Sequence, residues 1–470
     1  MEAALRGDLT REQGLLLHAL GPEAVVLFSL AVTRRLAQMQ SAMPGVAAPS
    51  AAVPTYLKPQ QPHGRRREKP GAKDGHPGTR RPTPQKIDRH EEHRLDGCPC
   101  CGGQLQRCKR TRTRIIEDIP QQIQPIVTEH TLHRDYCPSC KKHVEPVVPD
   151  AMPNAALGHN VVALSSYFHY GLGLSINQCC EILGSTLSTK ITSGGLISAW
   201  DRMAEALLPW HEQIANELRS TAVLHADETG WRVDGRTHWL WCFADLQSCY
   251  YLIDRSRGGP ALQQFFINAF AGTLVSDFWS AYLAVMCEDR QYCLVHLLRE
   301  LEKVDERNGS LAWQAFAKQL RRLVRDGLRL RKRPDFSPEK YRSRILLINR
   351  RLNQLANDST EGMYDDADAR RLGERISRHR DHLFTFLDKP QVPSDNNHAE
   401  RQIRPAVIMR KNILCNRSVG GAQTQAILMS IFRTLKLRGH DPTQTIAGAL
   451  REMLQTGKLP PLPMRVVAGG

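Results

Sequence analysis

Three apolar stretches near the middle of the chain have the composition of β-strands and are separated by turn signals. They are TAVLHADETGWRV (221–233), THWLWCFAD (237–245) and SCYYLID (248–254). Asp234-Gly235, between the first two, favours a two-residue hairpin. The pattern predicts a three-strand antiparallel meander.

The chain then switches between helix and strand patterns. Residues 258–270 and 279–286 predict helices, whereas GTLVSD (272–277) and QYCLVH (291–296) predict short strands. The expected order from 221 to 296 is therefore β-β-β-α-β-α-β.

Helical patterns dominate the rest of the chain. Residues 297–387 are charge-rich and helical, with breaks at Asn308-Gly309 and Arg333-Pro334. A further helix is expected after Ser394-Asp395, where either residue would cap it, and another over 443–454.

Residues 155–218 are also expected to be helical. Within them, SINQCCEIL and ITSGGLISAWDRMAEAL flank a short break and resemble a helix-turn-helix, whose second helix could read a DNA groove. Plain packing of two helices is the alternative.

Basic residues are concentrated near the N-terminus. The 470 residues include 64 Lys or Arg against 48 Asp or Glu, a formal net charge of +16 that favours a polyanionic partner. From Lys58 to Arg114 there are 16 basic and 6 acidic residues. This Pro- and Gly-rich stretch predicts either a solvated tether or a linker that contacts DNA phosphates through Arg65, Arg66, Arg67, Arg80 and Arg81.

The sequence gives no sign of a membrane partner. AVVLFSLAV (24–32), the longest clean apolar run in the first part of the chain, is half the length that a membrane span needs. No signal peptide precedes it, so we expect a cytoplasmic protein that is nucleoid-associated when bound to DNA. The 13 cysteines are then expected to be reduced thiols.

Two CxxC pairs have the spacing of zinc knuckles. Cys98 and Cys101 lie in CPCCGG, and Cys137 and Cys140 lie in CPSC. Four thiolates suit one tetrahedral structural Zn²⁺, and paired knuckles are how zinc ribbons close a small β fold. Cys100 is interpreted as a bystander, although it could exchange with Cys101 as a ligand.

Two acids end strand patterns that are separated along the chain. Asp227 closes the first strand of the meander, and Asp277 closes GTLVSD. If these strands are neighbours, the two carboxylates lie close together, and their repulsion favours a cation between them. Glu228 alternates to the opposite strand face and is not expected to be a ligand.

A third acid would complete such a metal site. Glu400, in SDNNHAERQIRP, is the candidate, and Asp395 is the rival, although helix capping explains Asp395 well. Three carboxylates suit two Mg²⁺ or Mn²⁺ ions, a pair that assists in-line attack on a phosphodiester. Singly, each acid is more simply a cap or a surface ion pair, whereas the three together favour a metal-dependent enzyme acting on DNA.

Several of these segments resemble the motifs of one family. HADETGW, the Asp of LVSDFWSAY, the CLVHLLREL segment and SDNNHAERQIRP resemble, in that order, the transposase family of bacterial insertion sequence 66. This family is a branch of the DDE superfamily with a ribonuclease-H-like catalytic core. The resemblance covers roughly residues 60 to 460, and DNNHAER is its most specific piece. Phe278 stands where a Gly commonly follows the second Asp.

The resemblance implies that Asp227, Asp277 and Glu400 are the DDE triad, with the helices of 297–387 inserted before the Glu. It also implies metal-dependent cleavage at transposon ends, followed by attack of the freed 3′-hydroxyl on target DNA, and a zinc-binding domain at the cysteine pairs. Positioning or DNA-contacting roles would fall to His296, Asn396, Asn397 and Arg401. For His296, a structural histidine at a helix start is the alternative.

The expected partners are DNA, as transposon ends and target, a second copy of the chain on DNA, and accessory proteins of the same element. The competing interpretation is a non-catalytic zinc-ribbon DNA-binding regulator derived from a transposase. A metal-dependent nuclease that never joins strands is a third possibility.

The patterns predict a multidomain α+β protein with a zinc-ribbon-like domain and helical segments, and the resemblance implies that its α/β core is ribonuclease-H-like and carries a helical insertion. The expected parts are an N-terminal helical segment (1–40), a basic linker (41–94), the zinc-ribbon-like domain (95–150), a helical region that is a candidate for DNA binding (151–220), the first part of the core (221–296), the insertion (297–390), the last core helix with Glu400 (391–440), and a C-terminal helix and tail (441–470).

Overall fold

The computed structural model describes residues 84, 86–96, 98–106, 112–120 and 123–466, with a few isolated positions between 15 and 28. Two compact units are present, one formed by Val53–Gln122 and a larger one formed by Met1–Ala52 and Ile123–Gly470. Most of the helical pattern expected within 1–40 lies outside the described residues, and so do Arg65, Arg66, Arg67, Arg80 and Arg81. The helices and strands named below all belong to the larger unit.

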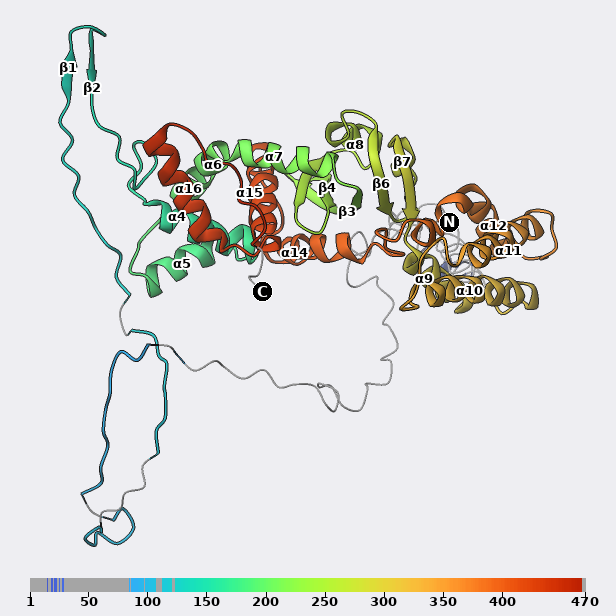
Figure 1. Cartoon of the computed structure of the whole chain (residues 1–470), viewed down its shortest axis with the longest axis horizontal. Coiled ribbons are helices and arrows are strands. Elements are labelled where there is room, and N and C mark those ends of the chain that lie inside the picture. The colour runs from blue at the N-terminus through green and yellow to red at the C-terminus, as the bar shows by residue number, and fades with distance from the viewer. Residues whose placement is uncertain are drawn as a thin grey trace. The chain divides into compact units, whose positions relative to one another are not determined.

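A five-stranded mixed sheet organises the larger unit (Figure 1). Its order is β5-β4-β3-β6-β7, with β3, β4 and β5 antiparallel, β6 parallel to β3, and β7 parallel to β6. The strands are β3 (Val223–Val233), β4 (Arg236–Ala244), β5 (Cys249–Asp254), β6 (Phe270–Ser276) and β7 (Cys287–Tyr292). The predicted meander is confirmed.

The hairpin between β3 and β4 has the predicted two-residue turn. Val233 pairs with Arg236, and Asp234 and Gly235 between them have φ values of 50° and 69°. Positive φ at both turn residues matches the twist of antiparallel strands, and Asp-Gly is among the few residue pairs that favour it. This turn fixes the register that carries Asp227 to its place in the sheet.

Two of the predicted elements after the meander are wrong in type or place. The helix expected over 279–286 is only a 3₁₀ turn, η3 (Ser280–Ala284), because the buried Tyr282 side chain and the extended Val285 leave no room for a longer helix between β6 and β7. The strand expected over 291–296 is instead β7, which ends at Tyr292. Acidic and basic residues on β7 hid the strand pattern, and such charges are typical of edge strands.

The helices predicted over 297–387 are confirmed as a group, and their hydrophobic core also includes Val275 and Tyr292 of the sheet. Loops at 306–310 and 332–341 interrupt the group, close to the two predicted breaks. In Figure 1 these helices stand together beside the sheet. They are α9 (Leu294–Asp305), α10 (Leu311–Arg331), α11 (Arg342–Thr360), α12 (Ala367–His379), the 3₁₀ turn η4 (Arg380–His382) and α13 (Thr385–Asp388).

Helices precede and follow the core strands. The predicted helical region before β3 is confirmed, and α8 (Gly259–Phe265) is shorter than the helix expected there. A hairpin of two short strands, β1 (Asp135–Cys137) and β2 (Lys142–Val144), precedes them. The helices are α4 (His159–Ser166) with its π-helical extension η2 (Tyr167–Gly171), α5 (Ile176–Thr186), α6 (Ser193–Ala206), α7 (Leu208–Arg219), α14 (Asn397–Ile413), α15 (Val419–Leu437) and α16 (Pro442–Thr456). Of these, α7, α14 and α15 pack against the sheet.

Helix α15 was not anticipated as a separate element, and it covers the edge of the sheet. The hydroxyl of Thr434 accepts a hydrogen bond from Cys249 N (3.0 Å), and the hydroxyl of Ser430 accepts one from Tyr251 N (2.8 Å). Both nitrogens belong to the edge strand β5, whose unpaired N–H groups would otherwise be buried without partners. Two hydroxyl groups one helical turn apart thus accept hydrogen bonds that the carbonyl groups of a neighbouring strand would otherwise accept.

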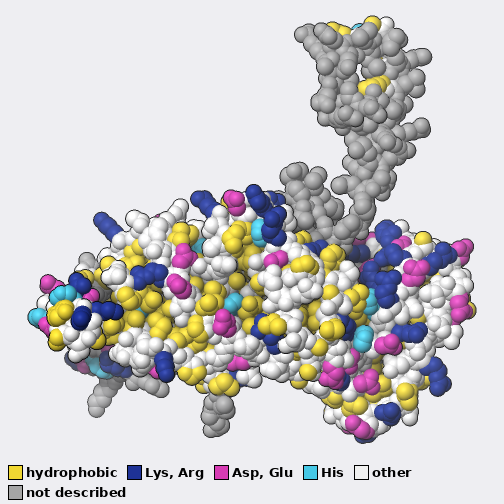
Figure 2. All heavy atoms as spheres, turned by 90° about the horizontal axis from the view of Figure 1, so that it is seen from above, with side chains coloured by type: hydrophobic (Ala, Val, Ile, Leu, Met, Phe, Trp, Pro, Cys, Tyr) yellow, Lys and Arg dark blue, Asp and Glu magenta, His cyan; other side chains and the backbone are white. Residues whose placement is uncertain are grey.

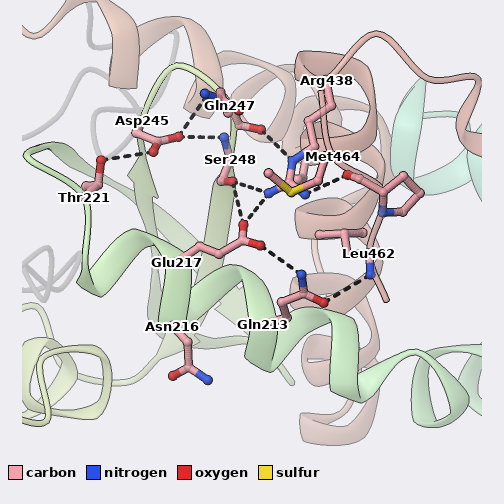
Figure 3. A network of polar contacts seen from close by, with 12 residues as sticks. Gln213, Asn216, Glu217, Thr221, Asp245, Gln247, Ser248, Arg438, Leu462 and Met464 are labelled. Atoms are coloured by element: carbon pink, nitrogen blue, oxygen red, sulfur yellow. Dashed lines mark hydrogen bonds and ion pairs between the residues drawn. The ribbon is translucent and has the colours of Figure 1, made fainter. Parts of the chain in front are cut away.

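A buried arginine joins α15 to the C-terminal tail (Figure 3). The side chain of Arg438 is 3% exposed and pairs with Glu217 of α7. It also donates to Ser248 Oγ and to Pro463 O, each at 2.8 Å. These contacts hold the β4–β5 turn, α7 and the tail against one another.

Two further observations concern membrane-spanning helices and the cysteines. Among the described residues, no helix combines the length and apolar character required to cross a membrane. The cysteines of the described segments are all free.

Buried histidines should make the fold acid-labile. His169 stacks on Trp200 with a centroid distance of 5.1 Å, its Nδ1 lies 2.6 Å from Leu174 O, and burial lowers its pKa to about 4. An unfolded histidine takes up a proton near pH 6.5, so stability present above that pH is lost as the pH falls toward 4. The loss should be on the order of 3 kcal/mol at pH 4, since one pKa unit is about 1.4 kcal/mol.

Urea unfolding between pH 7 and pH 4 measures this effect. The pH dependence should shrink in His169→Gln and stay as in the wild type in His143→Gln, because His143 is exposed. An identical pH dependence in all three proteins would contradict the assignment.

Candidate active site

The register of the parallel strands places Asp227 beside Asp277. Val223, Leu224 and His225 of β3 pair with Thr273, Leu274 and Val275 of β6, respectively. Continuing this register by two residues sets Asp227 opposite Asp277, which directly follows the last residue of β6. The two acids therefore lie next to each other, as predicted, but Asp227 does not end its strand, because β3 continues through the hairpin pairing with β4 to Val233.

The two acids leave the sheet on the face that α14 covers. Asp227 pairs across β4 with Cys242, which in turn pairs with Tyr251 of β5. The Tyr251 hydroxyl on this face donates to Gln402 O of α14 (2.5 Å). Pro405 in the helix interior lacks the N–H that would bond the carbonyl of Arg401, and Arg433 Nη2 donates to that oxygen instead (3.4 Å).

The start of α14 is anchored to β3 immediately before Asp227. Asn396 is 1% exposed, its Nδ2 donates to Ala226 O (2.7 Å), and its Oδ1 lies 3.1 Å from His225 Nδ1. The N-cap position belongs to Asn396, so the prediction that Ser394 or Asp395 caps this helix is wrong. The reason is that the Asn396 side chain is used to hold the sheet, while Asp395 Oδ1 accepts from Asn397 N (3.0 Å).

This anchoring brings Glu400, in the first turn of α14, into the electrostatic field of the two aspartates. Burial raises the pKa of the Asp227 carboxyl well above its ordinary value, and the charges of Glu228, Asp277 and Glu400 raise it further. The site is therefore a cluster of negative charge with too little positive charge of its own. Hard oxygen donors in such a cluster suit a divalent cation.

Glu400 itself is turned toward α9. Its Oε1 lies 3.7 Å from His296 Nε2 and 3.5 Å from Arg299 Nη1. His296 Nδ1 is buried and has no hydrogen-bond partner among the described residues. Within the described residues, no three acidic, His or Cys side chains are already gathered at metal-binding distances. A shared ion would require the Glu400 side chain to turn from α9 toward the aspartates.

Glu228 occupies the opposite face of the sheet, as its alternation predicts. Its side chain is 2% exposed and lies 3.0 Å from Arg257 Nη2, while the Tyr282 hydroxyl donates to its Oε2 (2.6 Å). Burial and the charge of Asp277 raise the pKa of Glu228 to about 7, against the opposing effects of Tyr282 and Arg257. The Glu228 carboxylate therefore takes part in a buried ion pair and does not point toward α14.

Arg257 links that ion pair to Asp277, a connection that sequence reasoning missed. Its guanidinium lies between two indole rings, 3.9 Å from the centroid of Trp279 and 4.3 Å from that of Trp239. Trp279 Nε1 donates to Arg257 O (3.0 Å), and Trp279 N donates to Asp277 Oδ1 (2.8 Å). The sequence offers only a weak signal for this link, since Trp239 and Trp279 each lie about twenty residues from Arg257 along the chain.

Phe278, which stands where the family commonly has a Gly, packs toward the helical insertion. Its ring stacks on Tyr292 at 4.9 Å, and the Arg375 guanidinium lies 5.7 Å from its centroid. The turn beside Asp277 is therefore held by packing. Arg401, one of the expected DNA contacts, is exposed on α14.

Each CxxC pair forms a knuckle whose first thiol accepts backbone hydrogen bonds. Hydrogen bonds from Cys100 and Cys101 lower the pKa of Cys98, and those from Cys140 lower the pKa of Cys137. Cys140 N lies 3.5 Å from Cys137 Sγ at the tip of the β1–β2 hairpin. Backbone N–H groups that favour the thiolate form are what a zinc ligand needs.

Comparison with known proteins gives the class of the chain. Residues 155–424 match the "Transposase IS66 family", and residues 96–141 match the "zinc-finger binding domain of transposase IS66". The first match covers more than half of the chain. The chain therefore belongs to the IS66 transposase family, as its motifs predict. Zinc binding, DNA binding and an origin in a mobile element accompany this membership.

Two curated relatives come from Sinorhizobium fredii (strain NBRC 101917 / NGR234). "Uncharacterized protein y4jD" is 24% identical over 413 residues, which cover 79% of this chain and 78% of the relative. "Uncharacterized protein y4hP" is 22% identical over 429 residues, covering 79% and 73%. The similarity thus extends along most of each chain.

Proposed function

We propose that this chain is an active DDE transposase, in which Asp227, Asp277 and Glu400 catalyse DNA cleavage and strand transfer. One observation carries the proposal: the β3–β6 register sets the two aspartates side by side, and Asn396 anchors the helix of Glu400 to the same strand. The order β5-β4-β3-β6-β7, with three antiparallel and two parallel strands, supports a ribonuclease-H-like core.

The three carboxylates fit divalent metal ions by their chemistry. Their oxygens are the ligands that Mg²⁺ and Mn²⁺ prefer, and the raised pKa of Asp227 reports a charge that a cation would neutralise. Two bound ions would activate water, or a DNA 3′-hydroxyl, and stabilise the leaving oxygen of a phosphodiester. Asp227 and Asp277 would hold them from the sheet, and Glu400 from α14.

Other residues would prepare this site for DNA. In the protein without metal, His296 and Arg299 hold Glu400 toward α9, from which it would turn when ions bind. The exposed Arg401 and the half-buried Asn397 on α14 would contact the DNA backbone. Transposon ends and target DNA are the proposed substrates. A second copy of the chain and accessory proteins of the same element are the other proposed partners. The proposed domains keep the boundaries that the sequence predicts.

A non-catalytic regulator derived from a transposase is the second candidate. The experiment that separates the two incubates the full chain with a labelled transposon-end duplex and Mg²⁺ or Mn²⁺. Metal-dependent nicking followed by a strand-transfer product is expected. DNA binding without nicking would refute the enzyme and favour the regulator, whereas nicking that never leads to joined strands would indicate a nuclease.

One structural Zn²⁺ held by Cys98, Cys101, Cys137 and Cys140 is the proposed role of the knuckles. Cys137→Ser should reduce bound zinc from about one ion per chain to nearly none, because three thiolates bind Zn²⁺ far more weakly than four. Metal analysis of the purified protein measures this, with Cys100→Ser as the matched control. Retention of zinc by Cys137→Ser would contradict the assignment. Loss of zinc from Cys100→Ser would show that Cys100 is one of the zinc ligands.

A further inference from the structure

The helical insertion carries a second concentration of positive charge, separate from the N-terminal linker. Residues 311–360, which span α10 and α11, contain 13 Lys or Arg against four Asp or Glu. This excess of nine is close to the excess of ten basic residues found between Lys58 and Arg114. The face drawn in Figure 2, which is seen from above, shows basic and acidic side chains mixed over the end of the larger unit where the insertion lies.

Part of this charge forms a single line along α10, here called the basic stripe. Its members follow one another at spacings of four, three, four and three residues, so they share one face of the helix. All are exposed. They are Lys318, Arg322, Arg325, Arg329 and Lys332.

The basic stripe is not needed to fold α10. The core-facing residues of this helix, among them Trp313, Leu320 and Leu323, lie on the opposite side. No member of the stripe forms an ion pair with another described residue, whereas neighbouring Arg321 pairs with Asp305 and Arg351 pairs with Asp326. Positive charge near the helix C-terminus offsets the macrodipole, but this cannot account for Lys318, Arg322 and Arg325 farther from that end.

Like charges at these spacings repel one another and weaken the helix. A chain that keeps five of them in line without acidic partners presents a surface suited to a polyanion. The stripe is about 21 Å long at 1.5 Å per residue, so it can follow several phosphates of one DNA strand. Arg329 also lines a groove of about 310 Å³ between α10 and α11. Arg344 of α11, which has no ion pair to a described residue, faces the same groove.

We infer that the basic stripe of α10 is a binding surface for the phosphate backbone of duplex DNA, which it engages without reading sequence. This inference deepens the proposed function and rests on it, because it assigns the helical insertion a share of the DNA that the triad cuts. An acidic protein segment is the competing occupant.

The test measures binding of the full chain to a labelled duplex of unrelated sequence across a salt series. Arg322→Glu with Arg325→Glu should weaken binding at least about tenfold near 0.1 M salt, and should reduce the slope of log affinity against log salt by roughly two. The matched control is Arg370→Glu with Arg378→Glu, which makes the same charge change on exposed positions of α12. The control should bind nearly as the wild type does.

Folding does not confuse the result. Removing repulsion along α10 should leave the Tm of the stripe variant unchanged or higher, and Arg322→Gln with Arg325→Gln replaces it if the charge reversal prevents folding. Equal DNA affinity for the stripe and control variants would overturn the inference. Polyglutamate serves as the probe for an acidic protein segment, and a stripe variant that loses binding to polyglutamate but keeps its DNA affinity would also overturn the inference. If the wild type nicks transposon ends but the stripe variant binds normally, only the stripe assignment fails. If the wild type neither binds nor nicks DNA, the proposed function fails with it.

Discussion

Asp227→Asn should lower metal-dependent nicking of a transposon-end duplex by at least about 10³-fold. A metal-bound transition state is stabilised by several kcal/mol, and each 1.4 kcal/mol or so is a factor of ten in rate. Asparagine keeps the shape of the side chain but loses the charge that a cation needs. DNA binding should be retained, because the substitution removes a negative charge beside the phosphate backbone. Single-turnover nicking in Mn²⁺ and fluorescence anisotropy measure the two quantities.

The same substitution should raise the Tm of the metal-free protein or leave it unchanged. The raised pKa of Asp227 shows that the folded state disfavours this carboxylate, since burial and three neighbouring acids oppose its charge. The matched control is Asp234→Asn in the exposed β3–β4 turn, where φ is 50° and asparagine is well tolerated. Nicking by Asp227→Asn at the rate of this control would exclude Asp227 as a metal ligand.

The sequence allowed the sheet to be predicted because its signals are local. A turn dipeptide with positive φ fixed the hairpin, and strand composition fixed the meander. The pairing of Asp227 with Asp277 followed from acids in two strand patterns, which a parallel register then brings together, although only Asp277 follows the end of its strand. Chemistry at strand ends is visible in a sequence whenever the strands themselves are.

The elements that were missed depend on contacts between distant segments. Helix α15 is buried on most sides, so it lacks the one-sided apolar pattern that reveals a surface helix. Its Ser430 and Thr434 look like loop residues until the edge of β5 supplies their partners. Likewise, Asn396 looks like a cap until His225 and Ala226 are found beside it. Such roles appear only when the tertiary structure is known.

Arg257→Met should lower the free energy of unfolding by about 3 kcal/mol, the loss typical when one partner of a buried ion pair is removed. Glu228, at 2% exposed, would be left without its cation, and the guanidinium packing against Trp239 and Trp279 would be lost. Combining Arg257→Met with Glu228→Gln should restore part of the stability, since no uncompensated charge then remains. Urea unfolding of the two single variants and the double variant gives the coupling free energy.

Arg257→Met should also affect metal binding at the active site, although Arg257 lies on the opposite face of the sheet. Trp279 joins Arg257 O to Asp277 Oδ1 through its indole and backbone N–H groups, so loosening Arg257 loosens a proposed metal ligand. Groups that orient metal ligands typically contribute 10- to 100-fold in metal affinity. The Mn²⁺ concentration for half-maximal nicking should rise by about that factor in Arg257→Met. It should not change in Arg255→Met, an exposed arginine of the same loop. Equal metal dependence in both variants would confine Arg257 to stabilising the fold.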